Sequence, residues 1–586
     1  MVNLSLNKAA SRDSDTLALL GKKQVLKRRF GFWSLLGFAI CELITWETVL
    51  ALFSQGFSNG GPAGLVYGFI IAWSSTLSVY TVISELASLA PIAGGQYYWV
   101  YMLAPPRWKV FSSYIVGWLT SMAWIATVAT ETIFAGTILQ GLIILDHENS
   151  YMPQNWHGTL MAWLVVAVAI FVNAVIPGAL PRLEVFIIVF HIAGFIAIVS
   201  VLWVFATPKN SAHFVFATSL NEGGWSTQGL SYCVGFLGNV ATFVGADASV
   251  HLAEEVENAA RNIPRAIITS MCVNGAVGFV MMITLLFCLG DVDTVLETAT
   301  GYPFIQIFYD AVNDYAGATV MGAVVLALTW ACATGIITTA SRMVWSFARD
   351  RGTPFSSALS RVSGNKKIPV VALLAGTGFA CLLTLIYIGS DTAFNDVISL
   401  TITGFYSSYF LPASLLLYHR VKGNIAPHQT GGGDILEAQA PTFDAETGEH
   451  APTKDRGSDD EDKAPEARSP DLPTSDVLDS QHQPRRKFSL ANAQLVWGPF
   501  HLPGRIGIIN NAYACVYMIF VIFWSVWPPQ ADTNYQNMNY SIVVTGGVVI
   551  FSIVWYYIKG RKEYDGPTVD EEVEAVMRRG SVVAGR

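Results

Sequence analysis

The sequence predicts an all-α polytopic membrane protein with about twelve transmembrane helices, and both its composition and its apolar stretches support this class. Only 13% of the 586 residues are charged, whereas soluble proteins carry about 25%, and 52% are hydrophobic. A helix of about 20 apolar residues crosses the hydrocarbon core of a bilayer. Stretches of this kind begin near Gly31, Pro62, Phe111, Gly158, Val185, Gln228, Ala266, Ala316, Val370, Ala393, Ile506 and Tyr540.

The basic residues orient the predicted helices. If the N-terminus lies in the cytosol and the helices alternate in direction, 34 of the 35 Lys and Arg residues fall on the cytosolic side, and only Lys209 lies outside. Cytosolic loops of membrane proteins are enriched in positive charge. We therefore expect both termini in the cytosol and a plasma-membrane location, with the vacuolar or another internal membrane as the alternative. No apolar run precedes the first helix, so no cleaved signal peptide is expected.

Composition divides the chain into five regions. Residues 421–504 are rich in Gly, Pro, Ser, Asp and Glu, and within them residues 431–484 hold 14 acidic and 4 basic residues. This acidic excess is larger than the net charge of −8 of the whole chain, so the remaining residues are together close to neutral. No nucleic-acid-binding surface is therefore implied. Such a segment cannot bury enough apolar surface to fold, and we expect a disordered cytosolic loop. The other regions are a cytosolic tail at 1–29, helices one to ten at 30–420, helices eleven and twelve at 505–560, and a cytosolic tail at 561–586.

Three motifs follow the second, sixth and eighth helices. Residues 84–97 read Ser-Glu-Leu-Ala-x-x-x-Pro-x-Ala-Gly-Gly-Gln-Tyr, residues 251–266 begin His-Leu-Ala-Glu-Glu-Val, and residues 341–354 hold Ser-Arg and then Phe-Ala-Arg-Asp-x-Gly-x-Pro. In this order and at these positions they closely resemble the amino acid–polyamine–organocation transporter superfamily. Gly-Gly-Pro at 60–62 and Asn-Met-Asn-Tyr-Ser at 537–541 are similar to its fungal amino acid/choline branch.

The resemblance covers nearly all of residues 30–567 except the acidic segment. It implies the five-plus-five inverted-repeat (LeuT-like) fold with two extra C-terminal helices, and transport by alternating access. Such transporters bind their solute near the midplane, where the first and sixth helices are interrupted. Gly37 and Gly245 match the expected breaks, although small residues also permit close helix packing. The expected substrate-binding residues are Gly37, Phe38, Ala39 and Glu42 in the first helix, and Asn239, Thr242, Phe243, Gly245 and Asp247 in the sixth.

Acidic residues outnumber cations at the predicted membrane depth. Glu42, Glu47, Glu131 and Asp247 lie within apolar stretches, and His191 is the one candidate cation that accompanies them. A buried charge costs a few kcal/mol, so each needs a partner or a function. This balance favours a cationic or zwitterionic solute. Glu42 lies about 13 Å into the bilayer and is the expected partner of the solute's ammonium group; a protonated Glu bonded to a neighbouring helix is the alternative.

Three further residues are assigned to coupling and to the outer mouth. His191 follows Glu184 by seven residues, the place that a Lys occupies in proton-coupled bacterial relatives, and histidine changes charge near neutral pH. We therefore expect His191 and Glu131 to take part in proton coupling, with a structural core histidine as the alternative. Trp46 beside Glu47 suits a quaternary amine at an outer vestibule, whereas both types also serve as interfacial anchors.

These features together predict a secondary active transporter, a proton symporter that imports an amino acid, choline or a related small amine. The solute is left open among choline, γ-aminobutyrate, a polyamine and a neutral amino acid. No catalytic residue, metal site or cofactor is expected, since no nucleophile elbow, metal spacing or phosphate-binding loop is found. A nutrient sensor that keeps the binding site is the alternative. Kinases or ubiquitin-ligase adaptors are candidate partners at the basic cytosolic segments 485–489 and 578–581.

Overall fold

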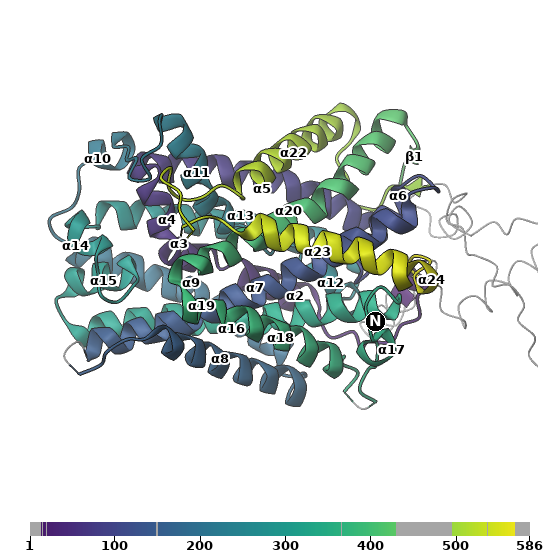
Figure 1. The fold of residues 1–586 in the computed structure, drawn as a ribbon, viewed down its shortest axis with the longest axis horizontal. Coiled ribbons are helices and arrows are strands. Elements are labelled where there is room, and N and C mark those ends of the chain that lie inside the picture. The colour runs from purple at the N-terminus through teal and green to yellow at the C-terminus, as the bar shows by residue number, and fades with distance from the viewer. Residues whose placement is uncertain are drawn as a thin grey trace, which may run out of the picture.

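A computed structural model provides the structure of residues 13–14, 16–18, 20–147, 150–364, 366–428, 495–535 and 537–568. These residues are mostly helical, with one pair of two-residue strands and one isolated bridge. The long helices lie side by side along the long axis of the molecule (Figure 1). The predicted all-α membrane class is confirmed.

Within the described residues, eleven helices are long and apolar enough to cross a membrane. They are α2 with α3 (Phe32–Leu43 and Thr45–Ala51), α5 (Gly61–Leu89), α7 (Lys109–Asp146), α8 (Asn155–Val175), α9 (Leu180–Phe205), α13 (Ala259–Phe287), α16 (Tyr315–Arg349), α18 with α19 (Val370–Thr384 and Ile386–Gly389), α20 (Asp391–Lys422), α22 (Gly504–Trp524) and α23 (Ser541–Trp555), which continues through η3 (Tyr556–Gly560) and α24 (Arg561–Glu563).

The remaining predicted span, the sixth, is present in two pieces that are each too short to cross a bilayer. They are α11 (Gln228–Ala241) and α12 (Ala248–His251), and residues 242–247 between them are not helical. With this interrupted span, the order of elements agrees with the predicted set of about twelve. The short elements that join the spans are α4 (Phe53–Ser58), α6 (Gln96–Leu103), α10 (Ala212–Ala217), η1 (Ala253–Glu255), α14 (Val292–Leu296), α15 (Pro303–Val312) and α17 (Ser356–Leu359).

Burial separates central helices from peripheral ones. Helix α7 is buried on nearly every side, whereas α9 and α23 expose large apolar side chains such as Phe186, Val189 and Ile550. Water would penalise such exposed apolar surfaces, but acyl chains are as apolar as the side chains themselves. The outer helices therefore present the surface that a bilayer requires.

Glycines allow central helices to approach closely. A side chain at Gly37 of α2 would overlap the backbone carbonyl of Glu184 in α9, and one at Gly136 of α7 would overlap the backbone of Ala162 in α8. Small residues at helix contacts are typical of membrane proteins, because packing rather than the hydrophobic effect joins their helices. The structure thus gives Gly37 a packing role between the first and fifth spans.

The segment predicted as one disordered loop, residues 421–504, is structured at both ends. Helix α20 continues to Lys422, and β1 (Ile425–Ala426) pairs in parallel with β2 (Leu495–Val496). The expectation is wrong for these ends because backbone pairing joins them across the long insertion. Residues 429–494, including the basic segment at 485–489, lie outside the described residues, as do residues 569–586 with the segment at 578–581.

The end of the predicted N-terminal tail also packs against the helices. Leu17, Leu20 and Lys22 are buried, and Phe30 forms a parallel bridge with Val256. This part of the chain lies at the same end of the molecule as α17 and α24 (Figure 1). Both described ends of the chain therefore meet at one face, which we call the inner face.

The packing role of Gly37 predicts a sharp difference between two glycines. Gly37→Ala introduces a methyl group against backbone that cannot move aside, and such overpacking destabilises by about 1–3 kcal/mol. Gly378→Ala in α18 is the control, because no atom lies within 4 Å of its added Cβ. In melting curves of the detergent-solubilised protein, we expect Gly37→Ala to lower the midpoint and Gly378→Ala to leave it unchanged or raise it. Equal midpoints would contradict this packing.

Candidate functional site

The first span is interrupted at Ile44. Helix α2 ends at Leu43, Ile44 adopts φ 28°, and α3 begins at Thr45. The predicted break at Gly37 is therefore wrong in position, since Gly37, Phe38 and Ala39 lie inside the continuous helix α2. The actual break follows Glu42 by two residues, which leaves Glu42 in the last turn before the interruption.

Asn274 of α13 holds the break at Ile44. Its Oδ1 accepts the backbone N–H of Thr45 at 3.3 Å, and its Nδ2 donates to the carbonyl of Ile40 at 3.3 Å. The hydroxyl of Thr45 donates to the carbonyl of Thr242 at 3.1 Å, which joins the two interrupted spans. A break inside a membrane needs such partners because lipid offers none. Our sequence reasoning missed Asn274, although an amide in an apolar span is a usable signal.

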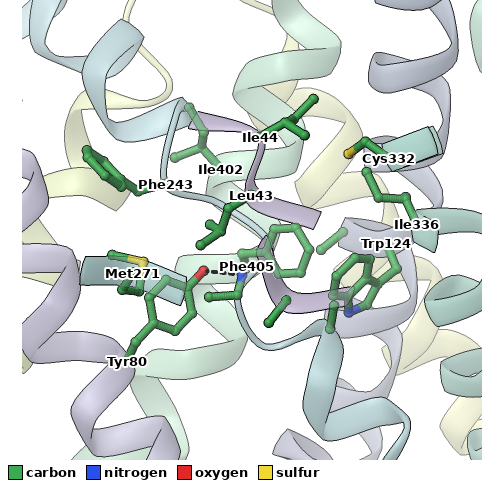
Figure 2. Close-up of a cluster of buried hydrophobic side chains, with 14 of the residues drawn as sticks. Leu43, Ile44, Tyr80, Trp124, Phe243, Met271, Cys332, Ile336, Ile402 and Phe405 are labelled. Carbon is green, nitrogen blue, oxygen red and sulfur yellow. Dashed lines mark hydrogen bonds between the residues drawn. The ribbon is translucent and has the colours of Figure 1, made fainter. Parts of the chain in front are cut away.

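The second interruption depends on Gly245. Its φ is +114°, a region that side-chain-bearing residues rarely adopt, and its Cα faces the carbonyl of Glu42 in the first break. The backbone N–H groups of Gly245 and Ala246 donate to the hydroxyl of Tyr80 on α5, at 3.1 and 3.2 Å. Figure 2 shows Tyr80 reaching the break from below, with Leu43 and Ile44 of the first break above it. The prediction of a break at Gly245 is confirmed.

A small cavity lies beside the two breaks. Its volume is about 50 Å³, and its walls come from α2, α3, α7, α11, α16 and α20. The polar residues of the lining include Glu42, Glu131, Thr48, Thr130 and Thr401. Space of this size holds a few water molecules, because one water needs roughly 10–15 Å³ of such volume. A larger molecule does not fit into a cavity of this size.

Glu42 has no hydrogen-bond partner for either carboxylate oxygen among the described residues, and Oε1 of Glu131 has none either. Both side chains are buried, with 3% and 7% of their surface exposed. A buried polar group without a partner is costly, and in native structures such a group points to a ligand, a proton or a function. The pair therefore provides a negatively charged or proton-binding patch inside the cavity.

Apart from Glu42, none of the predicted binding residues lines the cavity. Phe243 is buried against Phe69, with ring centroids 4.9 Å apart, and Figure 2 places it to one side of the breaks. Thr242 donates its hydroxyl to the carbonyl of Asn239 at 2.8 Å, and Asn239 packs against Gly68 of α5. These residues shape the sixth span, and Glu42 is the predicted binding residue that faces the cavity.

His191, Glu47 and Trp46 form one buried cluster, although the sequence suggested separate roles for them. Nδ1 of His191 lies 2.8 Å from Oε1 of Glu47 and 3.2 Å from the indole nitrogen of Trp46. Nδ1 offers either one N–H or one lone pair. With a proton on Nδ1 the ring bonds to Glu47, and without it the ring accepts from Trp46. The residues predicted at an open outer vestibule are thus fully buried, with 0–1% exposed.

Glu131 and His191, predicted to act together, lie in different places: Glu131 in the cavity wall and His191 in the cluster with Glu47. A fifth buried acid, Glu184 of α9, was used only as a spacing marker in the sequence. It is 1% exposed, and neither carboxylate oxygen has a hydrogen-bond partner within the described part of the chain. The predicted fifth span began near Val185, one residue after Glu184, so a count of acids within the predicted spans left Glu184 out.

Comparison with known proteins identifies the family. The amino acid permease family model matches residues 30–436. The chain belongs to the amino acid permease family. It is 32% identical to a Macrophomina phaseolina protein named for amino acid/polyamine transport, over 67% of this chain and 86% of that relative. It is 28% identical to the choline transporter of Saccharomyces cerevisiae, over 94% and 84%, and 26% identical to the GABA-specific permease of the same yeast, over 96% and 88%.

These matches confirm the resemblance to the amino acid–polyamine–organocation superfamily and its fungal branch. The protein is a multi-pass membrane transporter of amino acids or amines.

Ion pairs close the inner face of the permease. Arg342 contacts Glu255 at 2.7 Å, and Arg349 makes two bonds to Glu254, at 2.6 and 2.9 Å. All four residues belong to the second and third sequence motifs, so the family motifs meet across the fold. Such charge-assisted bonds are stronger and more directional than bonds between neutral groups.

Asp247 helps to close the same side. Its carboxylate accepts from the amide of Gln96 at 2.7 Å and from the hydroxyl of Tyr409 at 2.5 Å, and Nε2 of His251 lies 3.5 Å away. Asp247 is fully buried and is the last residue of the break, directly before α12. The predicted binding residue therefore anchors the inner half of the sixth span, with partners that leave it no need of a solute.

Asp350, at the end of α16, ties both described ends of the chain to the permease core. It pairs with the buried Lys22 and accepts from Tyr97 at 2.7 Å and from Thr568 at 3.0 Å. Burial, and then the neighbouring carboxylate of Asp350, raise the pKa of Tyr97, so its hydroxyl stays protonated and donates. The N-terminal segment is thus fixed across the inner face.

Asp350→Asn is expected to release this segment, because the buried ammonium of Lys22 loses the charge that stabilises it. In the detergent-solubilised protein, trypsin should then cut after Lys22 or Lys23 at least several times faster than in the parent. Asp293→Asn, on the exposed α14, is the matched control and should leave the rate unchanged. Unchanged cleavage in Asp350→Asn would show that Lys22 is held by other contacts.

Proposed function

We propose that this permease imports a small nitrogenous solute by proton-coupled alternating access, with Glu42 as the partner of the solute's ammonium group. The plasma membrane is its proposed location, with both termini in the cytosol. The unpartnered carboxylate of Glu42, buried at the meeting point of two interrupted spans, is the observation that carries the proposal.

The carboxylate explains why a cation would bind here. Glu42 has no counter-charge among the cavity-lining residues of the described chain, and the cavity adds Glu131. A buried unpaired charge is unfavourable, so the group remains protonated or acquires a cation. An arriving ammonium group supplies the charge and the hydrogen-bond donors together, which makes binding specific for that group.

The closed inner face and the small cavity support alternating access. Ligand sites for small molecules measure about 300–1,000 Å³, so the cavity of about 50 Å³ has to expand before a solute enters. The breaks at Ile44 and at residues 242–247 are places where half-helices can tilt without losing long runs of backbone bonds. Opening outward with the inner ion pairs intact, then inward after they separate, moves the site from one side to the other.

The cluster of His191, Glu47 and Trp46 supports proton coupling. A proton on Nδ1 binds the ring of α9 to Glu47 of α3, and its loss transfers that bond to Trp46. Helix α3 is the outer half of the first span, directly after the break. His191 of α9 is thus bonded to this half-helix through Glu47 or through Trp46, and the proton on Nδ1 decides which of the two it contacts, which is the kind of link that a symporter needs.

A nutrient sensor remains the alternative function. It was suggested by the acidic segment, which lies largely outside the described residues, and no contact in the structure favours it. Radiolabelled uptake separates the two functions, because a sensor binds its solute without accumulating it.

Glu42→Gln tests the proposed partner of the ammonium group. The amide keeps the shape of the side chain but removes its charge, and we expect uptake of a cationic amine to fall at least tenfold at equal protein level. Tenfold corresponds to about 1.4 kcal/mol of lost interaction. Glu297→Gln, at an exposed site after α14, is the control and should transport normally. Normal uptake by Glu42→Gln would remove Glu42 from solute binding.

His191→Ala tests the coupling cluster. We expect uptake by the parent permease to increase as the external pH falls from about 7.5 to 5.5, because a higher external proton concentration drives a proton symporter. His191→Ala should lose most of this dependence, whereas His213→Ala, an exposed histidine on α10, should keep it. A parent protein that ignores external pH, or an intact pH profile in His191→Ala, would contradict the coupling role.

A further inference from the structure

We infer that Tyr80 makes this site selective for small organic cations that lack a carboxylate, by occupying the backbone donors that would otherwise bind one. This inference rests on the proposed function, since it concerns the same cavity, and it narrows the solute class left open by the sequence. Small amines, polyamines and amino alcohols fit the class, whereas α-amino acids and γ-aminobutyrate do not.

The charges of the cavity favour a solute without an anion. Its lining includes two acidic residues, Glu42 and Glu131, and none of the lining residues identified in the described chain is Lys, Arg or His. Two like charges close together repel, and the repulsion is strong where water is scarce. The carboxylate of a zwitterionic solute would be repelled by these two acids. Such a solute would therefore need backbone N–H donors that bind its carboxylate away from them.

Backbone N–H groups at a helix break are the usual donors for such a carboxylate. Here three of them are already engaged. Gly245 and Ala246 donate to the hydroxyl oxygen of Tyr80, at 3.1 and 3.2 Å, and Thr45 donates to Oδ1 of Asn274 at 3.3 Å. A carboxylate has to displace Tyr80 or Asn274 before it reaches these donors. Displacement leaves a buried side-chain oxygen unpaired, which is costly.

Tyr80 is fixed in this position by its surroundings. It is 1% exposed, and its ring packs edge to face against Tyr409 with centroids 6.0 Å apart. The hydroxyl of Tyr409 in turn donates to Asp247 at 2.5 Å. Figure 2 shows the Tyr80 hydroxyl directed at the backbone of the break, between Met271 and Phe405. A displaced Tyr80 has little free space, and an incoming carboxylate would also approach the charge of Asp247.

The rest of the cavity suits a compact cation with an apolar body. Ile44, Ile336 and Ile402 supply apolar walls, and Thr48 and Thr130 supply hydroxyl groups within them. Either acid can accept from the ammonium group of such a solute. A solute of this kind leaves the bond between Tyr80 and the break intact.

The test is competition between matched pairs in cells that lack their own amine uptake. The pairs are choline with glycine betaine, putrescine with ornithine, cadaverine with lysine, and propylamine with γ-aminobutyrate. The members of each pair differ chiefly in the carboxylate. We expect some labelled amine to accumulate, and the member without a carboxylate to compete at least tenfold better in each pair that competes at all.

Two failures are distinguishable in this experiment. If no member of any pair accumulates when labelled, the proposed transport function fails. If labelled solutes accumulate but carboxylate-bearing members compete equally well or better, transport stands and the inferred solute class is overturned.

Tyr80→Phe tests the residue itself. The ring and its packing remain, but the N–H groups of Gly245 and Ala246 lose their acceptor and become available to a carboxylate. In each pair, we compare how well the carboxylate-bearing member competes with how well its amine partner competes. We expect this ratio to be at least tenfold higher in Tyr80→Phe than in the parent. Tyr406→Phe is the matched control, because that hydroxyl bonds to Thr76 at 3.2 Å, away from the break, and its ratio should not change. An unchanged ratio in Tyr80→Phe would overturn the role of Tyr80. The solute class itself is tested separately, by the paired competition in the parent protein.

Discussion

An unpaired carboxylate at the junction of two broken helices is the constraint on which the rest of this structure depends. Glu42 lies in the last turn of α2, and α16 leaves room for it, since a side chain at Gly335 would overlap Oε1 of Glu42. Lipid and apolar side chains provide no counter-charge, so the group needs a proton or a cation. In the proposed function the cavity admits this cation, Glu131 adds a second acid beside it, and the closed inner face separates the site from the side of the termini.

The broken helices are stable because side chains replace the missing backbone bonds. Asn274 satisfies the first break on both of its sides, and Tyr80 satisfies two donors of the second. Within a membrane each unsatisfied backbone group costs several kcal/mol, so these two residues are as necessary to the site as the glycine at the break. The same bonds determine which donors a solute finds free, and therefore stability and selectivity have one structural origin.

The sequence predicted the helix order, the interrupted sixth span and a buried acid beside the breaks, because apolar length, Gly245 and Glu42 are local signals. It misplaced the first break, since no glycine marks Ile44 and the true determinant, Asn274, lies more than two hundred residues away. It also separated His191 from Glu47, because spacing along a chain does not reveal which helices face each other. Contacts between distant spans, such as Tyr80 with residues 245–246, require the fold.

The most direct measurement is an experimental structure of the permease with a saturating small amine, such as putrescine or choline, in a lipid nanodisc. We expect an enlarged cavity with the solute's cationic nitrogen within about 4–6 Å of the Glu42 carboxylate, where an opposite charge stabilises it. A bound solute whose nitrogen lies away from Glu42, with that carboxylate still facing only apolar side chains, would contradict this expectation.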